Sequence, residues 1–418
     1  MTVWDGIPPS AENIRLLTSD KGWVVSKDEL NGDGSLANPG SGGRIESAFL
    51  NALNSSNLMV LTGAGASFSA SNATGNQAPG MNDLWNCVQQ QVGPTKFAEI
   101  LALFPTAPIA KNIEKLLTLC KIYLELNEGS SSKDFELVTN FVALAETVIL
   151  QRVDFVTKAT KLAEHMAFVR KIGRRGIRKS RTKLFTTNYD LCFEEAARRQ
   201  RFTVVDGFSH SLDQTYDRSN FDTDIVRRAN SKEGPDYIEN VFHLYKLHGS
   251  LDWRRFDAEI VRSKSDDGKP VLIYPRSSKY QEAFEPPYLD MIGSFQTALR
   301  EPDTAVIVSG FGFNDDHLSR PVLSALEANM SLRLIICDPS FVWSNDALPT
   351  GPHSIAASPL INPFFNRFQI LALSGDPRIH LMNGRFGDLS MALPDLVGET
   401  DRERHAMRIR NAMTGASA

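Results

Sequence analysis

The chain has 418 residues, of which 42% are hydrophobic and 22% charged, and a formal net charge of −4 at pH 7. These values are those of a globular protein that can bury a full core, and the length predicts one large domain with an insertion, or two domains. The small negative charge excludes an overall electrostatic attraction to nucleic acid or to a membrane surface, so any such contact would have to be local.

The chain begins with a segment rich in glycine and polar residues. Residues 31–35 and 38–43 consist of turn formers, and we expect residues 1–43 to be a flexible leader that lies on a partner surface or is mobile. The first residues lack the basic and apolar regions of a signal peptide, and no apolar run is long enough to cross a bilayer. We therefore expect a cytoplasmic protein.

Four widely spaced cysteines form no C-x-x-C pair: Cys87, Cys120, Cys192 and Cys337. Their spacing argues against a zinc ribbon and against a disulfide framework. We expect reduced and mostly buried thiols.

A short helix at 44–54 is expected to lead into a buried parallel strand at 58–61, which is continuously apolar. A loop of small residues follows: Gly63, Ala64, Gly65, Ala66 and Ser67. The glycines would let the backbone approach a pyrophosphate, and the next helix would offer its positive N-terminus. Phe68 stands where a full dinucleotide fingerprint has a third glycine, so an ordinary strand-to-helix turn is the alternative.

Helical periodicity replaces this pattern from about residue 83 to residue 170. We expect an α-helical module, about residues 83–180, inserted between the first and second strands of the sheet. The segment 69–81 before it is rich in small and polar residues and could close over a ligand. The basic run 170–181 predicts a solvated connecting loop, with a docking patch for an acidic partner or nucleic acid as the alternative.

Strands and helices alternate through the rest of the chain. Strands are expected at 183–187, 242–247, 271–274, 305–309, 332–337 and 379–382, and helices around 193–197 and at 288–299. This order predicts an α/β fold, a Rossmann-like doubly wound parallel sheet with an inserted α-helical module. Ligands of such sheets bind at the carboxyl ends of the strands.

Polar or glycine-rich loops follow four of these strands. Because the loops share one edge of the sheet, five side chains or backbone positions could converge there: Ser67, Asn188, Asp190, His248 and Gly310. Each has a structural alternative when taken alone. Asn188 could form an Asx turn, Asp190 could be a helix N-cap, and His248 could be a structural histidine.

Four motifs, in this order, resemble the NAD-binding catalytic core of the sirtuin family: Gly63-Ala64-Gly65-Ala66-Ser67, Thr187-Asn188-Tyr189-Asp190, Leu247-His248-Gly249-Ser250 and Gly310-Phe311-Gly312. The resemblance covers roughly residues 44–396, interrupted by the helical segment, and we expect residues 44–398 to be a sirtuin-like NAD-binding catalytic domain. Residues 399–418 would be a C-terminal tail.

The sequence departs from sirtuin deacylases after the histidine motif. Those enzymes carry a zinc-binding module with two cysteine pairs there, whereas residues 251–269 contain no cysteine. The chain is more similar to the bacterial sirtuin-like proteins of anti-phage defence, which lack the zinc module and hydrolyse NAD. Residues 246–253 and 313–317 resemble that branch in particular. We therefore expect NAD as the substrate, no zinc and no other metal site.

The resemblance implies roles for individual residues. Gly63, Ala64, Gly65 and Ser67 would cradle the pyrophosphate, with Ala66 and Thr187 in the same cofactor-binding set. Loss of nicotinamide from NAD leaves an oxocarbenium-like ribose. Asn188 would bind that ribose or orient the attacking water, and Asp190 would orient the carboxamide or stabilise positive charge. His248 would be the general base, because imidazole titrates near neutral pH.

The adenosine half of NAD would meet the loops of the last strands. Gly310 and Phe311 would let the sheet edge approach the ribose and phosphate, and Asp338 would bind ribose hydroxyls. Asp338 precedes a proline, so a turn former is the alternative.

These residues lead to the hypothesis of an NAD glycohydrolase that releases nicotinamide and ADP-ribose. The resemblance implies a gated, NAD-depleting effector of an antiviral defence complex that acts by abortive infection. A homo-oligomer is expected, with a HerA-type hexameric ATPase as a partner and without membrane or direct nucleic-acid binding. The helical insert, segment 69–81 and the basic run are the expected gates. The alternatives are a protein-lysine deacylase and a non-catalytic sensor of NAD or ADP-ribose.

Overall fold

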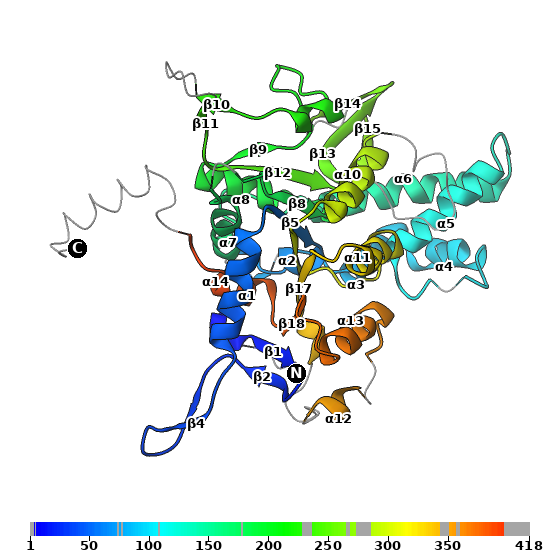
Figure 1. Cartoon of the computed structure of the whole chain (residues 1–418). Coiled ribbons are helices and arrows are strands. Elements are labelled where there is room, and N and C mark those ends of the chain that lie inside the picture. Colours follow the sequence, from blue (N-terminus) through cyan, green and yellow to red (C-terminus); the bar gives the residue numbers. More distant parts are fainter. Residues whose placement is uncertain are drawn as a thin grey trace.

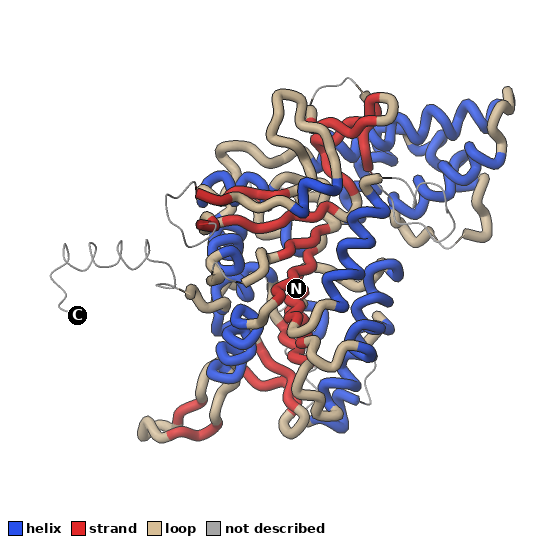
Figure 2. Tube along the Cα trace, turned by 45° about the horizontal axis from the view of Figure 1, so that its top comes forward, coloured by secondary structure: helices blue, strands red, loops and turns tan. Residues whose placement is uncertain are grey.

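The computed structural model describes residues 4 and 6–396, except 73–74, 77, 108, 177–178, 228–235, 265–267, 273–285, 343–350 and 357–359. Its centre is a large sheet with helices on both faces (Figure 1). A separate group of helices stands beside the sheet, and Figure 2 shows the same arrangement from a second direction.

The central sheet has nine strands in the order β2-β1-β18-β17-β16-β5-β8-β12-β9. All pairs from β18 to β9 are parallel. These parallel strands are β5 (Asn57–Thr62), β8 (Lys183–Thr186), β9 (Thr203–Val205), β12 (Val241–Lys246), β16 (Thr304–Ser309), β17 (Arg333–Cys337) and β18 (Ile379–Asn383). The predicted α/β fold with a doubly wound parallel sheet is confirmed.

Successive residues of β5 face two different cores, which explains why this strand is continuously apolar. Leu58 and Val60 belong to the core on one face of the sheet, and Met59 and Leu61 to the core on the other. The first face is covered by α1 (Gly42–Asn54), α7 (Ala163–Gly173), α8 (Cys192–Gln200) and α14 (Phe386–Ala392). The second is covered by α10 (Tyr288–Arg300), α11 (Asp316–Ala328) and α13 (Pro363–Leu373) (Figure 1).

Four helices form a module of their own, which we call the helical module: α3 (Met81–Val92), α4 (Pro94–Ala102), α5 (Ile113–Leu126) and α6 (Lys133–Val153). The ring of Phe97 packs edge-on against Trp85 and Phe141 in its core, with centroids 5.0 and 5.9 Å apart. Helix α7 packs instead on the sheet beside α8. The helices expected at 83–180 therefore belong to two different layers.

The first forty residues contribute strands to the fold. β1 (Arg15–Thr18) pairs antiparallel with β18 and with β2 (Gly22–Val25), and Leu16 and Leu17 are buried. β3 (Glu29–Leu30) and β4 (Leu36–Asn38) form a hairpin that projects from the body (Figure 1). The sequence pattern predicts no strand in this segment, because a strand of four residues is too short to show a periodic pattern.

A second, smaller sheet lies beyond the histidine motif, where the sequence indicated only one strand. Its order is β14-β13-β15, all antiparallel, with β13 (Gly249–Phe256), β14 (Glu259–Arg262) and β15 (Lys269–Leu272). The strand expected at 271–274 corresponds to β15, and residues 273–274 lie outside the described part. Further short elements are β6 (Ser71–Asn72), β7 (Gly75–Asn76), β10 (Val226–Arg227), β11 (Asp236–Tyr237) and α12 (Pro352–Ala356).

Two cations of the basic run 170–181 link the helices that cover the first face of the sheet. Lys171 Nζ donates to a main-chain carbonyl of α14 at 2.7 Å, and Arg175 Nε donates to the carbonyl of Leu53 in α1 at 3.1 Å. Both side chains are buried. The expectation of a solvated loop is therefore wrong for these residues, while 177–178 are not described.

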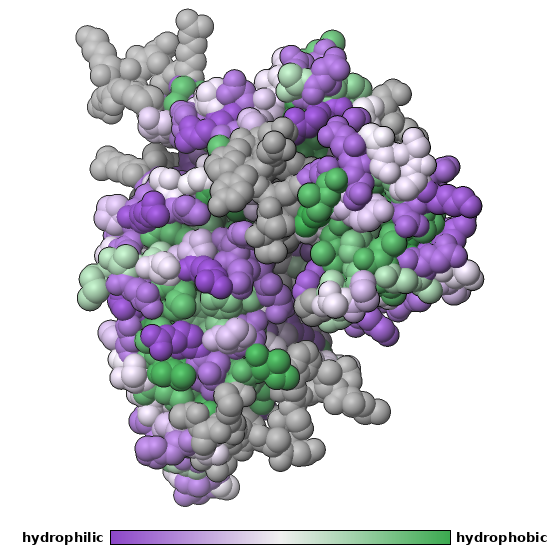
Figure 3. Space-filling model, turned by 90° about the vertical axis from the view of Figure 1, so that its right-hand side faces the viewer, coloured by the Kyte–Doolittle hydropathy of each residue, from purple (hydrophilic) through white to green (hydrophobic). Residues whose placement is uncertain are grey.

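All four cysteines are unpaired, so no disulfide stabilises the fold. Burial raises the pKa of the Cys120 thiol to about 12. Among the described residues, no helix is long and apolar enough to span a bilayer. On the face in Figure 3, hydrophilic side chains are interspersed with separate hydrophobic clusters.

His165 of α7 lies in the core, with its ring centroid 5.2 Å from that of Phe193 and 5.0 Å from that of Phe386. Neither ring nitrogen has a hydrogen-bond partner among the described residues. Burial lowers the pKa of His165 to about 4, against a smaller opposing effect of the Asp190 charge. An unfolded histidine titrates near 6.5, so the unfolded chain binds this proton first. Folding stability should therefore be lost as the pH falls from about 6.5 towards 4.

We expect His165→Leu to weaken this loss of stability at acid pH, because the variant has no imidazole to protonate on unfolding. Burial also lowers the pKa of His243 to about 4, so part of the pH dependence should remain. Urea unfolding near neutral pH and at about pH 5 measures the effect. His210→Leu, at an exposed position, is the control. An equal fall of the urea midpoint in the wild type and in His165→Leu would contradict this assignment.

Candidate functional site

Four parallel strands of the sheet end in one row. Their last residues pair with one another across the sheet in the order Ser309, Thr62, Thr186 and Lys246. Asn188 and His248 each lie two residues beyond this row, after the neighbouring strands β8 and β12. Since adjacent strands are about 4.8 Å apart, the two loops leave the sheet side by side.

The loop after β5 and the loop after β16 pack on each other through glycines. Gly65 N donates to Gly310 O at 2.9 Å, and a Cβ on Gly65 would lie 2.7 Å from Gly310 Cα. Gly310 has a φ of 69°, in the left-handed region that favours glycine. The resemblance implies that Gly65 approaches the pyrophosphate and that Gly310 approaches the adenosine ribose and phosphate. The contact between the two loops is a second requirement for glycine at both positions.

The helix expected after the small-residue loop is only four residues long. This helix, α2 (Ala64–Ser67), has Gly63 as its N-cap. Ala64 is exposed, whereas Ala66 and Ser67 are buried. Of the small side chains in this loop, that of Ala64 is therefore open to a ligand, and those of Ala66 and Ser67 form the base of the loop.

Asn188, Ser67 and Asp190 form a buried chain of hydrogen bonds. Asn188 Nδ2 donates to Gly63 O at 2.9 Å and to Ser67 Oγ at 2.7 Å. Ser67 Oγ donates to Asp190 Oδ2 at 2.6 Å, and Asp190 Oδ1 accepts from the main-chain N–H of Cys192 at 3.0 Å. Both oxygens of Asp190 are therefore engaged inside the protein, and its carboxylate acts on the site through Ser67.

Lys246 fixes the loop that carries Asn188. Its ammonium group is buried at the end of β12 and donates to the carbonyl oxygens of Tyr189, at 3.3 Å, and Asp190. A third bond, of 3.0 Å, goes to Glu194 Oε1. Burial raises the pKa of Glu194, and the Lys246 charge opposes that rise. This lysine is not among the predicted site residues, although its place at the end of an apolar strand is a signal.

His248 is paired with Asp315, a residue that is not among the predicted site residues. His248 Nε2 lies 3.1 Å from Asp315 Oδ2, and the side chains are 6% and 11% exposed. Asp315 Oδ1 accepts from the N–H of His317, which makes Asp315 the N-cap of α11 as well. Burial acts to raise the pKa of Asp315, but the hydrogen bonds and charges of His248 and His317 together outweigh it and hold this pKa below its ordinary value. His248 Nδ1 forms no hydrogen bond with the described residues.

Three other predicted site residues lie at the same edge without joining these contacts. Thr187 N donates to Thr62 O at 3.1 Å, and Phe311 packs on Phe313 with centroids 5.1 Å apart. Asp338 follows β17 and caps the 3-10 helix η3 (Pro339–Phe341), where its carboxylate accepts from the N–H of Ser340 at 2.9 Å. Burial raises the pKa of Asp338. Four strand spacings separate the β17 and β12 ends, which is roughly 19 Å.

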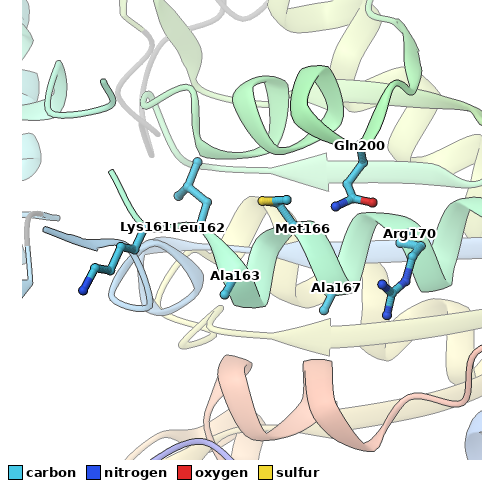
Figure 4. A pocket seen from close by; sticks show the side chains of 7 residues that line it. All are labelled: Lys161, Leu162, Ala163, Met166, Ala167, Arg170 and Gln200. Atoms are coloured by element: carbon cyan, nitrogen blue, oxygen red, sulfur yellow. The ribbon is translucent and has the colours of Figure 1, made fainter. Parts of the chain in front are cut away.

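A pocket beside α7 lies apart from these loops (Figure 4). Lys161 and Arg170 stand at its two ends, and none of the predicted site residues lines it. Within the described part of the chain, no group of three His, Cys, Asp or Glu side chains could hold a metal ion.

Comparison with known proteins agrees with the geometry of the strand ends. The family model of the SIR2-like domain matches residues 182–342, which run from the residue before β8 to the residue after η3 and include Asn188, His248 and Gly310. No curated protein matches the chain.

Proposed function

Because a SIR2-like domain at residues 182–342 indicates an NAD-related activity, we propose that this protein is an NAD glycohydrolase. The observation that carries the proposal is the pair of polar groups at the ends of two adjacent strands. The buried amide of Asn188 lies after β8, and the imidazole of His248, which is paired with Asp315, lies after β12. A hydrolase needs one group to hold the reacting sugar and a second to take a proton from water.

In this reaction the oxygen of water bonds to the anomeric carbon of the nicotinamide ribose. The bond from that carbon to the nicotinamide nitrogen breaks, and its electron pair leaves with neutral nicotinamide. His248 accepts the proton of the attacking water and passes it to solvent. Asp315 holds the Nε2–H of the imidazole, which directs the basic Nδ1 lone pair to the reaction. Asn188, fixed by Gly63 and Ser67, holds the ribose.

The loops at the sheet edge support binding of an extended dinucleotide. The row of strand ends runs from β17, with Asp338 beyond it, to β12, with His248 beyond it. The pyrophosphate would lie over the loop after β5, between the two nucleoside halves. Asp338 would hold the adenosine ribose at the far end of the row.

We extend the proposal to regulation and partners. Uncontrolled hydrolysis of NAD would kill the cell that makes the enzyme, so its activity is gated. The resemblance to sirtuin-like defence proteins supports an NAD-depleting effector in an antiviral complex. It also supports a homo-oligomer with a HerA-type hexameric ATPase as partner.

Incubation of the purified protein with NAD, alone and with the protein encoded beside it, tests the proposed activity. We expect equal amounts of nicotinamide and ADP-ribose to form, without added zinc and without an acyl-peptide. Nicotinamide release that requires an acetyl-lysine peptide would favour a deacylase. NAD binding measured by calorimetry, without nicotinamide release under any of these conditions, would favour a sensor.

A further inference from the structure

The helical module packs directly on the two loops that carry the candidate catalytic residues. Its hydrophobic core includes Tyr189, which is next to Asn188 in the loop after β8. It also includes Leu251, three residues beyond His248. Both side chains are buried. The Leu251 N–H donates to the Tyr189 carbonyl at 3.0 Å, so the module, the asparagine loop and the histidine loop meet at one place.

A carboxylate of the module reaches this meeting point. Glu114 stands in the first turn of α5, and its Oε1 accepts a hydrogen bond of 3.0 Å from the Tyr189 hydroxyl. The ring of Tyr189 in turn contacts the imidazole of His248, with ring centroids 6.5 Å apart. Glu114 is thus connected to His248 through one tyrosine side chain.

The charges at this point are arranged around the imidazole. Burial is the largest influence on Glu114 and raises its pKa, the charge of Asp315 adds to the rise, and the charge of His248 opposes it. The pKa of Asp315, which is bonded to the imidazole, is lowered although burial acts to raise it. His248 is therefore bonded to the carboxylate that caps α11, and a carboxyl group of the helical module interacts with it as well. The pKa values of these two groups are shifted in opposite directions.

We propose that the helical module completes the active site: Glu114 is a positioning residue that holds the Tyr189 phenol, and through it the imidazole of His248, in the place that turnover requires. The inference rests on the proposed function, since it assigns Glu114 and Tyr189 to the same site. It also gives the module a role in control. A partner or a second copy that moved α5 relative to the sheet would move His248 with it.

The test compares four variants of the full chain in nicotinamide release. Glu114→Ala and Tyr189→Phe should each lower kcat about 10- to 100-fold with little change in KM, because a displaced catalytic group slows the chemical step. The double variant should be no slower than either single variant, since both remove the same bond. Glu114→Gln keeps an oxygen that can accept from the phenol and should stay within a few-fold of the wild type.

Glu136→Ala is the matched control, because Glu136 is an exposed carboxylate in the first turn of α6, in the same module. It should leave kcat unchanged. A readout independent of turnover is the imidazole NMR signal of His248 in protein labelled at histidine. This signal should shift in Glu114→Ala and Tyr189→Phe and stay in place in Glu136→Ala.

Two results would overturn the inference: an unshifted His248 signal in Glu114→Ala, or kcat losses of the two single variants that multiply in the double variant. If the wild type releases no nicotinamide under any condition, the proposed function fails. The NMR comparison then still decides whether Glu114 positions His248.

Discussion

Replacing His248 by alanine is expected to lower the rate of nicotinamide release about 10²- to 10⁴-fold while the protein stays folded, because the variant loses its general base. The imidazole has one direct polar partner among the described residues, Asp315, and this carboxylate keeps its bond to the N–H of His317 when the imidazole is absent. The α11 cap should therefore survive the substitution. Release of nicotinamide and the urea midpoint measure the two effects.

Asp315→Asn tests how Asp315 positions the imidazole, separately from the proton transfer that His248 carries out. Asparagine is as good an N-cap as aspartate, so α11 should keep its first turn. The amide carries no negative charge to hold the Nε2–H, and turnover should fall by less than in His248→Ala. His210→Ala, at an exposed position, should leave the rate unchanged. Turnover by His248→Ala at the wild-type rate would remove the histidine from the mechanism.

Gly310→Ala is expected to destabilise the protein by roughly 2–4 kcal/mol, from a strained left-handed residue and an overpacked contact. The added Cβ would lie 2.3 Å from Ala66 N and 2.7 Å from Gly65 C, and both atoms belong to the backbone of the loop after β5. Neither loop can move away from the added Cβ without displacing the end of its strand. NAD binding should therefore weaken as well. Urea unfolding measures the first effect and calorimetric titration with NAD the second.

Gly293→Ala is the control for this substitution. Gly293 lies in α10 at an exposed position, and no atom comes within 4 Å of an added Cβ. Alanine should stabilise a helix interior by about 0.5–1 kcal/mol relative to glycine. If both variants changed the free energy of unfolding by similar amounts, the contact between the two loops would not be what requires Gly310.

The sheet could be predicted because its strands show a strong local signal. β5, β12 and β16 are six apolar-rich residues each, buried on both faces, and the expected bounds differ from the observed ones by one residue. β13 and β14 were missed because polar residues such as Asp252, Arg254 and Arg262 interrupt them. Arg262 forms an ion pair with Asp206, which is distant in the sequence. No local pattern predicts such a pairing.

The candidate site could be predicted in part for the same reason. Asn188 and His248 follow recognisable strands, so their place at the sheet edge could be inferred from the topology alone. Glu114 could not be connected with this edge, because it belongs to a helical pattern more than seventy residues before Asn188. Asp315 caps α11, and its second carboxylate oxygen lies beside His248, which follows a different strand, β12. Contacts between segments that are distant in the sequence cannot be predicted from local patterns.

The antiparallel pairing of β1 with β18 has a practical consequence for the production of shortened forms of the protein. A shortened chain that started at Arg44, where the sequence pattern changes to helix, would lack both β1 and β2. It would leave β18 with open N–H and C=O groups along one side, and an exposed strand edge of this kind invites aggregation. Asp388, which accepts from Ser10 N at 2.9 Å and Asn13 Nδ2 at 2.7 Å, would also lose these two donors. Soluble material for the experiments above should therefore keep the N-terminal strands.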